Sequence, residues 1–128
     1  MTEFKKTIIN TDKAPATVGT YSQGVLHNGT FFFSGQIGLS PETGKMAEGF
    51  DNQLTQILNN IDGLLESQNL TRNNIIKTTI FLTDLTNFPK VNGAYEEYFS
   101  KPYPARSCVQ VPALPANALV EIEVIAAI

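Results

Sequence analysis

One arginine in this sequence is well placed to bind an anion. Arg106 lies near the start of the segment Tyr103–Val111, with a proline before it and β-branched residues after it. Because strand side chains alternate between two faces, Cys108 should share the face of Arg106, while Val109 and Val111 should be buried on the other. An arginine on a rigid strand can bind a carboxylate or phosphate through two parallel hydrogen bonds. The alternative is a strand-end arginine that points into solvent.

Two glutamates near the end of the sequence also have types and spacing suited to chemistry. Glu121 and Glu123 fall on one face of the predicted strand Leu119–Ile125, and apolar residues occupy the other face. Such a pair could act as a general acid and base. Charged side chains are rarely buried, so the alternative is the solvated face of an edge strand, which we prefer for Glu123.

The elements that would position these residues begin with a hairpin and a helix. Asn28-Gly29 stands between two apolar runs and predicts a tight hairpin turn, because both residues tolerate positive φ. Residues 38–49 contain a proline and two glycines and are predicted as a loop. From Phe50 to Leu65, apolar residues recur with the period of an amphipathic helix and predict a core-facing stripe.

The second half of the chain predicts a strand, a helix and two more strands. The run Ile75–Thr83 is β-branched and nearly uncharged, which is typical of a central strand. Asn87 is a candidate N-cap for a second helix over Phe88–Phe99, which Pro102 and Pro104 would end. The last strands are predicted at 107–111 and 119–125.

The length and order of these elements indicate one α+β domain over residues 1–128. A single mainly antiparallel sheet would carry both helices on one face. The other face would still need a cover, which association with further copies of the chain would supply.

Composition narrows the class of partner. Apolar residues make up 42% and charged residues 16%, as in a soluble globular protein, and the net charge of −3 argues against nucleic acid. The sequence shows no membrane span and no hydrophobic leader, so we expect no membrane partner and a cytoplasmic location. The chain has one histidine and one cysteine, and it lacks a P-loop and a dinucleotide-binding glycine motif. We therefore expect no metal and no cofactor.

Four segments of the sequence form a recognisable set. They are Ala14–Gly24 (APATVGTYSQG), Phe33–Ile37 (FSGQI), Pro104–Val109 (PARSCV) and Glu121–Ala126 (EIEVIA). Together they resemble the Rid family of reactive-intermediate enamine and imine deaminases. They occur in the family's order and at close to its spacing, and the resemblance covers essentially the whole chain.

The resemblance implies a chorismate-mutase-like fold and a homotrimer whose ligand sites lie between neighbouring subunits. Arg106 would bind the substrate carboxylate, and Glu121 would orient the attacking water. The substrates would be small enamine or imine acids, such as 2-aminoacrylate, 2-iminopropanoate and 2-iminobutanoate. Hydrolytic deamination would convert them to 2-keto acids and ammonia without a cofactor, so the protein would be a 2-iminobutanoate/2-iminopropanoate deaminase.

The resemblance also assigns substrate contacts to Tyr21, Ser34, Gly35, Asn92 and Cys108. Tyr21 would line the pocket and hydrogen-bond the substrate, while the Ser34 hydroxyl and the Gly35 backbone would contact the ligand. Asn92 would lie near the substrate, and Cys108 would contribute mainly its backbone rather than a nucleophilic thiol.

Two alternatives to the deaminase remain. The first is a trimeric small-carboxylate binding or regulatory module, which would need Arg106 but would have no use for Glu121. The second is an RNA-cleaving or translation-inhibiting protein, an activity also attached to the family, which the acidic charge disfavours.

Overall fold

A computed structural model of the chain describes residues 3–128 and shows one mixed sheet with two helices. The six strands lie in the order β1-β2-β3-β6-β4-β5. Their bounds are Thr7–Ile9 (β1), Gly24–His27 (β2), Thr30–Phe33 (β3), Ile75–Leu82 (β4), Ala105–Gln110 (β5) and Val120–Ala127 (β6). All neighbours pair antiparallel except β4 and β5, which run parallel. The predicted α+β class is confirmed.

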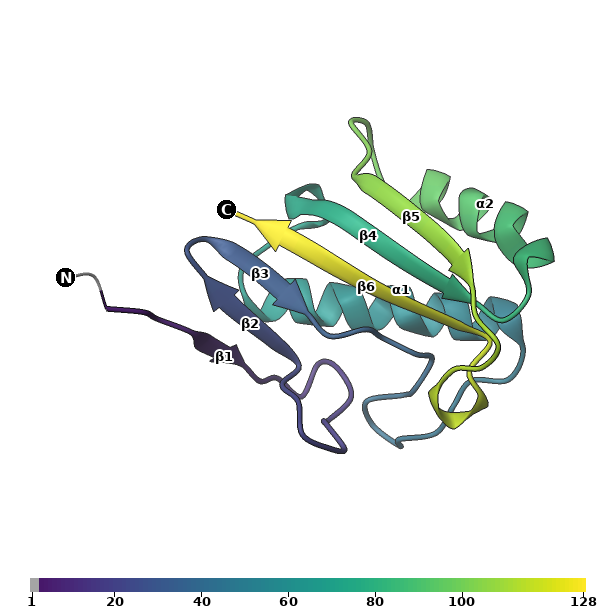
Figure 1. Cartoon of the computed structure of the whole chain (residues 1–128), viewed down its shortest axis with the longest axis horizontal. Helices are drawn as coiled ribbons and strands as arrows, with labels where there is room; N and C mark the ends of the chain where they lie inside the picture. The colour runs from purple at the N-terminus through teal and green to yellow at the C-terminus, as the bar shows by residue number, and fades with distance from the viewer. Residues whose placement is uncertain (1–2) are drawn as a thin grey trace.

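Both helices cover the same face of the sheet, as predicted (Figure 1). Helix α1 (Phe50–Ser67) buries one apolar stripe against the sheet, and Ile57 and Leu64 on this stripe are fully buried. Helix α2 (Phe88–Tyr98) begins after Asn87 with a proline in its first turn, although the Asn87 side chain makes no capping hydrogen bond. Short 3₁₀ turns lie at Arg72–Asn74 (η1), Leu85–Asn87 (η2) and Pro115–Asn117 (η3). Neither α-helix in the described part of the chain is long and apolar enough to span a bilayer.

The predicted hairpin joins β2 and β3. Asn28 and Gly29 have φ of 49° and 78°, as a tight turn with two left-handed residues requires. Residues 38–49 form the predicted loop between the hairpin and α1.

Strand register shows which side chains share a face. Phe81 of β4 lies between Glu121 of β6 and Val109 of β5, so these three side chains share the open face of the sheet. Arg106 pairs with the fully buried Thr78 and therefore points to the helix-covered face.

The expectation that Val109 and Val111 are buried is wrong. Val109 is 45% exposed on the open face, and Val111 lies just beyond the end of β5 and is only half-buried. The strand is at the edge of the sheet, and it is Cys108, on its other face, that packs against the core.

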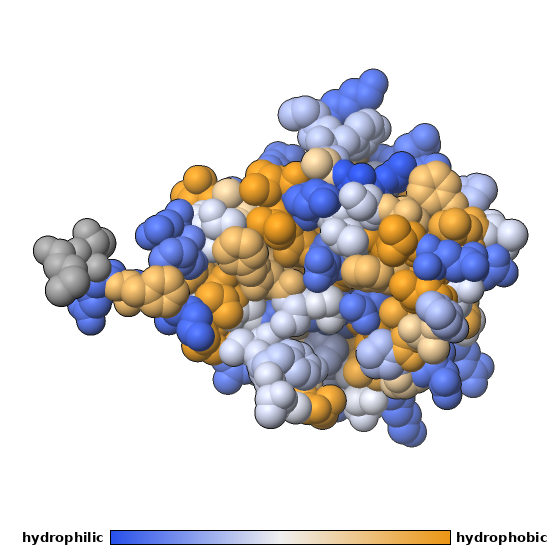
Figure 2. Space-filling model, viewed as in Figure 1, coloured by the Kyte–Doolittle hydropathy of each residue, from blue (hydrophilic) through white to orange (hydrophobic). Residues whose placement is uncertain are grey.

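Apolar side chains form a row across the open face. Register aligns Ile8, Val25, Phe32 and Ile125 on four neighbouring strands, and Phe32 is 48% exposed. Figure 2 shows this face with apolar side chains exposed among polar ones. Ile8 and Phe32 are about half exposed, while Val25 and Ile125 are less so, and the row therefore meets solvent in a single chain.

Candidate active site

Arg106 is held against helix α2 by an amide and two aromatic rings. Its Nη1 donates a hydrogen bond of 2.5 Å to Asn92 Oδ1. Its guanidinium carbon lies 5.0 Å from the ring centre of Phe88 and 5.8 Å from that of Tyr95. These contacts fix the direction of the side chain and leave donors on the guanidinium that Asn92 does not use.

A cleft of about 320 Å³ opens beside Arg106. Asn92, Tyr95, Tyr103 and Pro104 contribute to its walls. Within residues 3–128, no carboxylate forms an ion pair with Arg106. The positive charge is thus free to bind an anion from outside the chain.

Cys108 lies two residues further along β5, on the face of Arg106. Its side chain is partly buried, and this burial raises the pKa of the thiol, although the positive charge of Arg106 opposes the shift. A raised pKa keeps the sulfur protonated at neutral pH, which does not favour a nucleophilic role.

A second cleft, of about 640 Å³, contains Glu121. Tyr21, Ser34 and Gly35 line the same cleft, so the structure brings four of the predicted site residues together. Tyr21 is 51% exposed, and its hydroxyl is 3.5 Å from the Val18 backbone nitrogen. The Ser34 hydroxyl donates a 2.6 Å hydrogen bond to the Ser22 carbonyl, so toward a ligand it can serve only as an acceptor.

The Glu121 carboxyl group is half-buried, and its environment favours the protonated form. Removal from solvent is the larger cause of its raised pKa, and the negative charge of Glu123 adds to it. Glu123 itself is exposed, as expected. Gly35 packs directly against the Glu121 carboxylate and leaves no room for even a methyl group.

The predicted residues therefore fall into two groups on opposite faces of the sheet. Arg106, Asn92 and Cys108 lie on the helix-covered face, while Glu121 and Gly35 border the cleft of the open face. A single chain does not bring the arginine and the glutamate to one ligand.

Sequence reasoning missed the aromatic support of Arg106. The sequence predicted only that Phe88 and Tyr95 fall within the second helix, yet their rings flank the guanidinium. The signal was available: Phe88, Asn92 and Tyr95 follow the i, i+4, i+7 spacing of one helix face.

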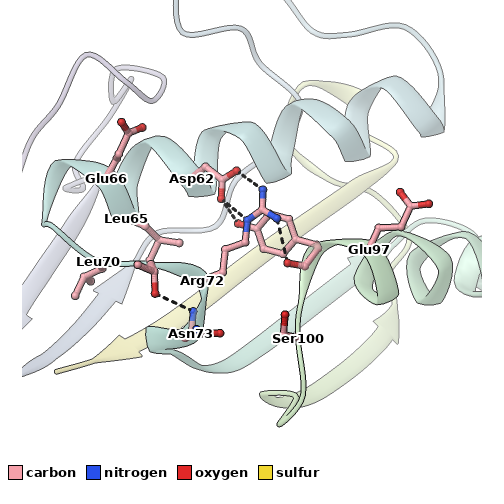
Figure 3. Close-up of a pocket in the computed structure, with 10 residues that line it drawn as sticks. Asp62, Leu65, Glu66, Leu70, Arg72, Asn73, Glu97 and Ser100 are labelled. Carbon is pink, nitrogen blue, oxygen red and sulfur yellow. Dashed lines mark hydrogen bonds and ion pairs between the residues drawn. The ribbon is translucent and has the colours of Figure 1, made fainter.

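A third hollow, of about 530 Å³, lies where the C-terminal end of α1 meets η1 and α2 (Figure 3). Arg72 forms two hydrogen bonds to the Asp62 carboxylate, of 3.0 and 2.8 Å, and a third to the Tyr98 carbonyl. The Tyr98 hydroxyl donates to Asp62 at 2.6 Å, and the Arg72 guanidinium stacks 3.9 Å above the Tyr98 ring. Because these groups bind one another, we interpret their contacts as a structural clamp that joins α1, η1 and α2. We do not interpret the hollow beside them as a ligand site.

Known proteins match nearly the whole chain. The sequence model of the family described as Endoribonuclease L-PSP matches residues 11–128. A RutC family protein of Aquifex aeolicus is 52% identical over 120 residues, which cover 92% of this chain and 96% of that protein. A 2-iminobutanoate/2-iminopropanoate deaminase of Bos taurus is 41% identical over 127 residues, 98% of this chain and 93% of that protein.

A solved structure also matches nearly the whole chain. The crystal structure of RidA from the Antarctic bacterium Psychrobacter sp. PAMC 21119 superposes with a TM-score of 0.93 and 46% sequence identity. The match covers 95% of this chain and 99% of that one. With the fold, the family match and these relatives in agreement, the chain belongs to the Rid family.

Proposed function

We propose that this protein hydrolyses small 2-imino acids and their enamine tautomers to 2-keto acids and ammonia, in a site that joins Arg106 of one copy to Glu121 of another. The observation that carries the proposal is the placement of these two residues on opposite faces of one sheet, each in its own cleft. A second copy of the chain can bring its Glu121 cleft to the Arg106 cleft of the first, so that the two together form one site. The deaminase name of the bovine relative supports the choice of reaction.

Arg106 would bind the substrate carboxylate through two parallel hydrogen bonds. Asn92 and the two rings already orient the guanidinium, so little side-chain freedom is lost when the ligand binds. Strand β5 is at the sheet edge, and its outer backbone groups around Cys108 are available to the same ligand.

Glu121 would act on water. A carboxylate whose pKa is raised by burial is a stronger base than an ordinary glutamate, and it can take a proton as water attacks the imine carbon. That proton passes to the substrate nitrogen and gives a carbinolamine, which carries one hydroxyl and one amino group on the former imine carbon. Glu121 would then carry the hydroxyl proton to the amino nitrogen, so that the C–N bond breaks, ammonia leaves and the keto group forms. Imines are already electrophilic, so positioning and one proton carrier are sufficient.

We further propose that the assembly is a homotrimer. The apolar row Ile8-Val25-Phe32-Ile125 on the open face needs a partner, and further copies of the chain would bury it. An interface that pairs one face with a different face of the next copy gives a ring when the rotation between copies closes, which for a trimer is one third of a turn. Each interface of that ring would hold one complete site.

The first test is keto-acid release while a serine or threonine dehydratase generates the imine in situ. We expect Arg106→Ala to reduce kcat/KM by about 30-fold to several thousand-fold, since it leaves the substrate carboxylate unpaired. Glu121→Gln should reduce kcat, whereas Glu123→Gln, the matched control two residues away, should retain most of the activity. Binding of a small carboxylate without acceleration by the wild type would instead indicate a binding module.

Mixed assemblies test the shared site directly. Arg106→Ala and Glu121→Gln chains, refolded together at equal amounts, should regain activity at about one site in four, because random pairing restores one intact arginine–glutamate interface. If the mixture stays as inactive as its components, the two residues do not act across an interface.

A further inference from the structure

Three buried side-chain amides bind the loops that form the walls of the Glu121 cleft. Gln23, Gln53 and Asn60 are 3%, 5% and 1% exposed. The walls come from residues 15–18, from residues 34–39 and from the loop before β6 that contains Pro115 and Ala116. Each amide hydrogen-bonds the backbone of one of these segments or of the loop that leads into it.

Two of the amides fix the first two walls. Gln23 accepts from the Thr11 backbone nitrogen at 2.7 Å and donates to the carbonyls of Thr11 and Pro15, both at 2.9 Å. Asn60 donates to the Leu39 carbonyl at 2.9 Å. These bonds give partly buried backbone groups of the two walls a partner within the chain.

Gln53 binds the backbone just before the strand that carries Glu121. Its Oε1 accepts a 2.9 Å hydrogen bond from the backbone nitrogen of Leu119, two residues before Glu121. The Leu119 carbonyl accepts a 3.3 Å hydrogen bond from the Thr83 nitrogen, so both the N–H and the C=O group of Leu119 are hydrogen-bonded. Gln53 stands seven residues before Asn60 on α1, so the two amides lie on the same stripe of the helix.

The turn that precedes Leu119 is strained and needs such an anchor. Ala116 and Asn117 have φ of 55° and 56°, and the Ala118 nitrogen closes the turn onto the Pro115 carbonyl at 3.1 Å. Asparagine tolerates the left-handed backbone region of positive φ, but alanine does not adopt it readily. Strained residues persist only where their surroundings hold them, and Ala116 lines the cleft beside Glu121.

We propose that Gln53 is a positioning residue: its buried amide fixes the start of β6, and through it the direction of Glu121 and the place of the Ala116 wall. The inference rests on the proposed function, because Glu121 matters only if it acts on a ligand. It assigns to α1 a role in the site that its sequence, read as a core helix, does not indicate.

The test compares Gln53→Met, Gln53→Glu and Tyr98→Phe. Methionine keeps the shape of the side chain but lacks the acceptor, whereas glutamate retains an oxygen that can accept from Leu119. Tyr98→Phe is the control, because it removes the bond to Asp62 at the other end of α1 and weakens the fold without touching the cleft. Each variant is assayed for imine hydrolysis, for thermal stability and for hydrogen exchange at the Leu119 amide.

We expect Gln53→Met to lower kcat/KM by about 10- to 100-fold and to speed exchange at Leu119, because small displacements of a catalytic group are costly. Gln53→Glu should keep most of the wild-type kcat/KM and most of the protection of the Leu119 amide from exchange. Tyr98→Phe should lower the melting temperature while kcat/KM stays within about twofold of the wild type. Activity that falls in proportion to melting temperature in all three variants would overturn the proposal. So would unchanged Leu119 exchange in Gln53→Met, a result that can be read even if the wild type shows no deaminase activity.

Discussion

The contact between Gly35 and Glu121 predicts a substitution that impairs activity and spares the fold. A Cβ added at Gly35 would lie 2.9 Å from Cδ and 3.2 Å from Cγ of Glu121, and nearer still to Oε2. Ordinary contacts begin near 3.4 Å, so the carboxylate has to move by about 0.5–1 Å. Gly35 itself does not need a left-handed backbone, so Gly35→Ala should not strain the chain.

A displacement of this size sets the expected magnitude. Misplacing a catalytic group by about 1 Å costs up to about 100-fold, so kcat/KM should fall by about 10- to 100-fold, or about 1.4–2.7 kcal/mol in transition-state stabilisation. The free energy of unfolding should change by less than about 1 kcal/mol, because the atoms that move are the end of a half-exposed, flexible side chain.

The assay is keto-acid release beside a urea denaturation curve for each variant. Gly93→Ala is the matched control: nothing lies within 4 Å of the added methyl on α2, and this variant should gain about 0.5–1 kcal/mol in stability with unchanged kinetics. Wild-type kcat/KM in Gly35→Ala would refute the argument that this contact sets the position of Glu121. A large loss of stability in that variant would refute the claim that only the carboxylate moves.

Three further predictions follow from the same side chains and turns. Burial raises the pKa of Glu121 above its ordinary 4.5, so the protonated carboxyl favours the folded state at low pH, and this contribution to stability is lost as pH rises. Urea denaturation should therefore show Glu121→Gln to be more stable than the wild type at about pH 7 but not at about pH 3. Because the ionised base is the active form and Glu123 adds to the raised pKa, Glu123→Gln should shift the acid limb of the kcat/KM profile to lower pH. Arg72→Met should lower the free energy of unfolding by about 1–2 kcal/mol with unchanged KM, since it breaks a partly exposed clamp whose two charged residues line neither cleft.

The local elements of the fold could be predicted from the sequence because their causes are local. Asn28-Gly29 specifies a turn by its own backbone preferences, and the apolar period of Phe50–Leu65 specifies a helix face without knowledge of what covers it. The error at Val109 and Val111 has a different origin. Alternation shows which side chains share a face, but whether that face is buried depends on which face of the sheet the helices cover, and Val109 lies on the open face.

The candidate site was predictable as a set of residues but not as an arrangement. The resemblance of four sequence segments to the Rid family indicated Arg106, Glu121 and the residues near them as candidates, and their roles stay predictions. That Arg106 and Glu121 face opposite ways follows only from the register of β4 with β5 and β6, which joins distant parts of the chain. The amides of Gln53 and Asn60 gave no signal, because polar positions on an amphipathic helix are expected to face solvent.

The opposed faces of the sheet make the proposed activity subject to mass action. If each chain carries only half of a site, an isolated monomer has no turnover, and specific activity should decline on dilution once the copies dissociate. A ligand that contacts both halves would then act as a bridge between chains and raise the apparent association constant. Substrate supply and oligomer population would be linked quantities, so a rate measured at one protein concentration would not describe the protein at another.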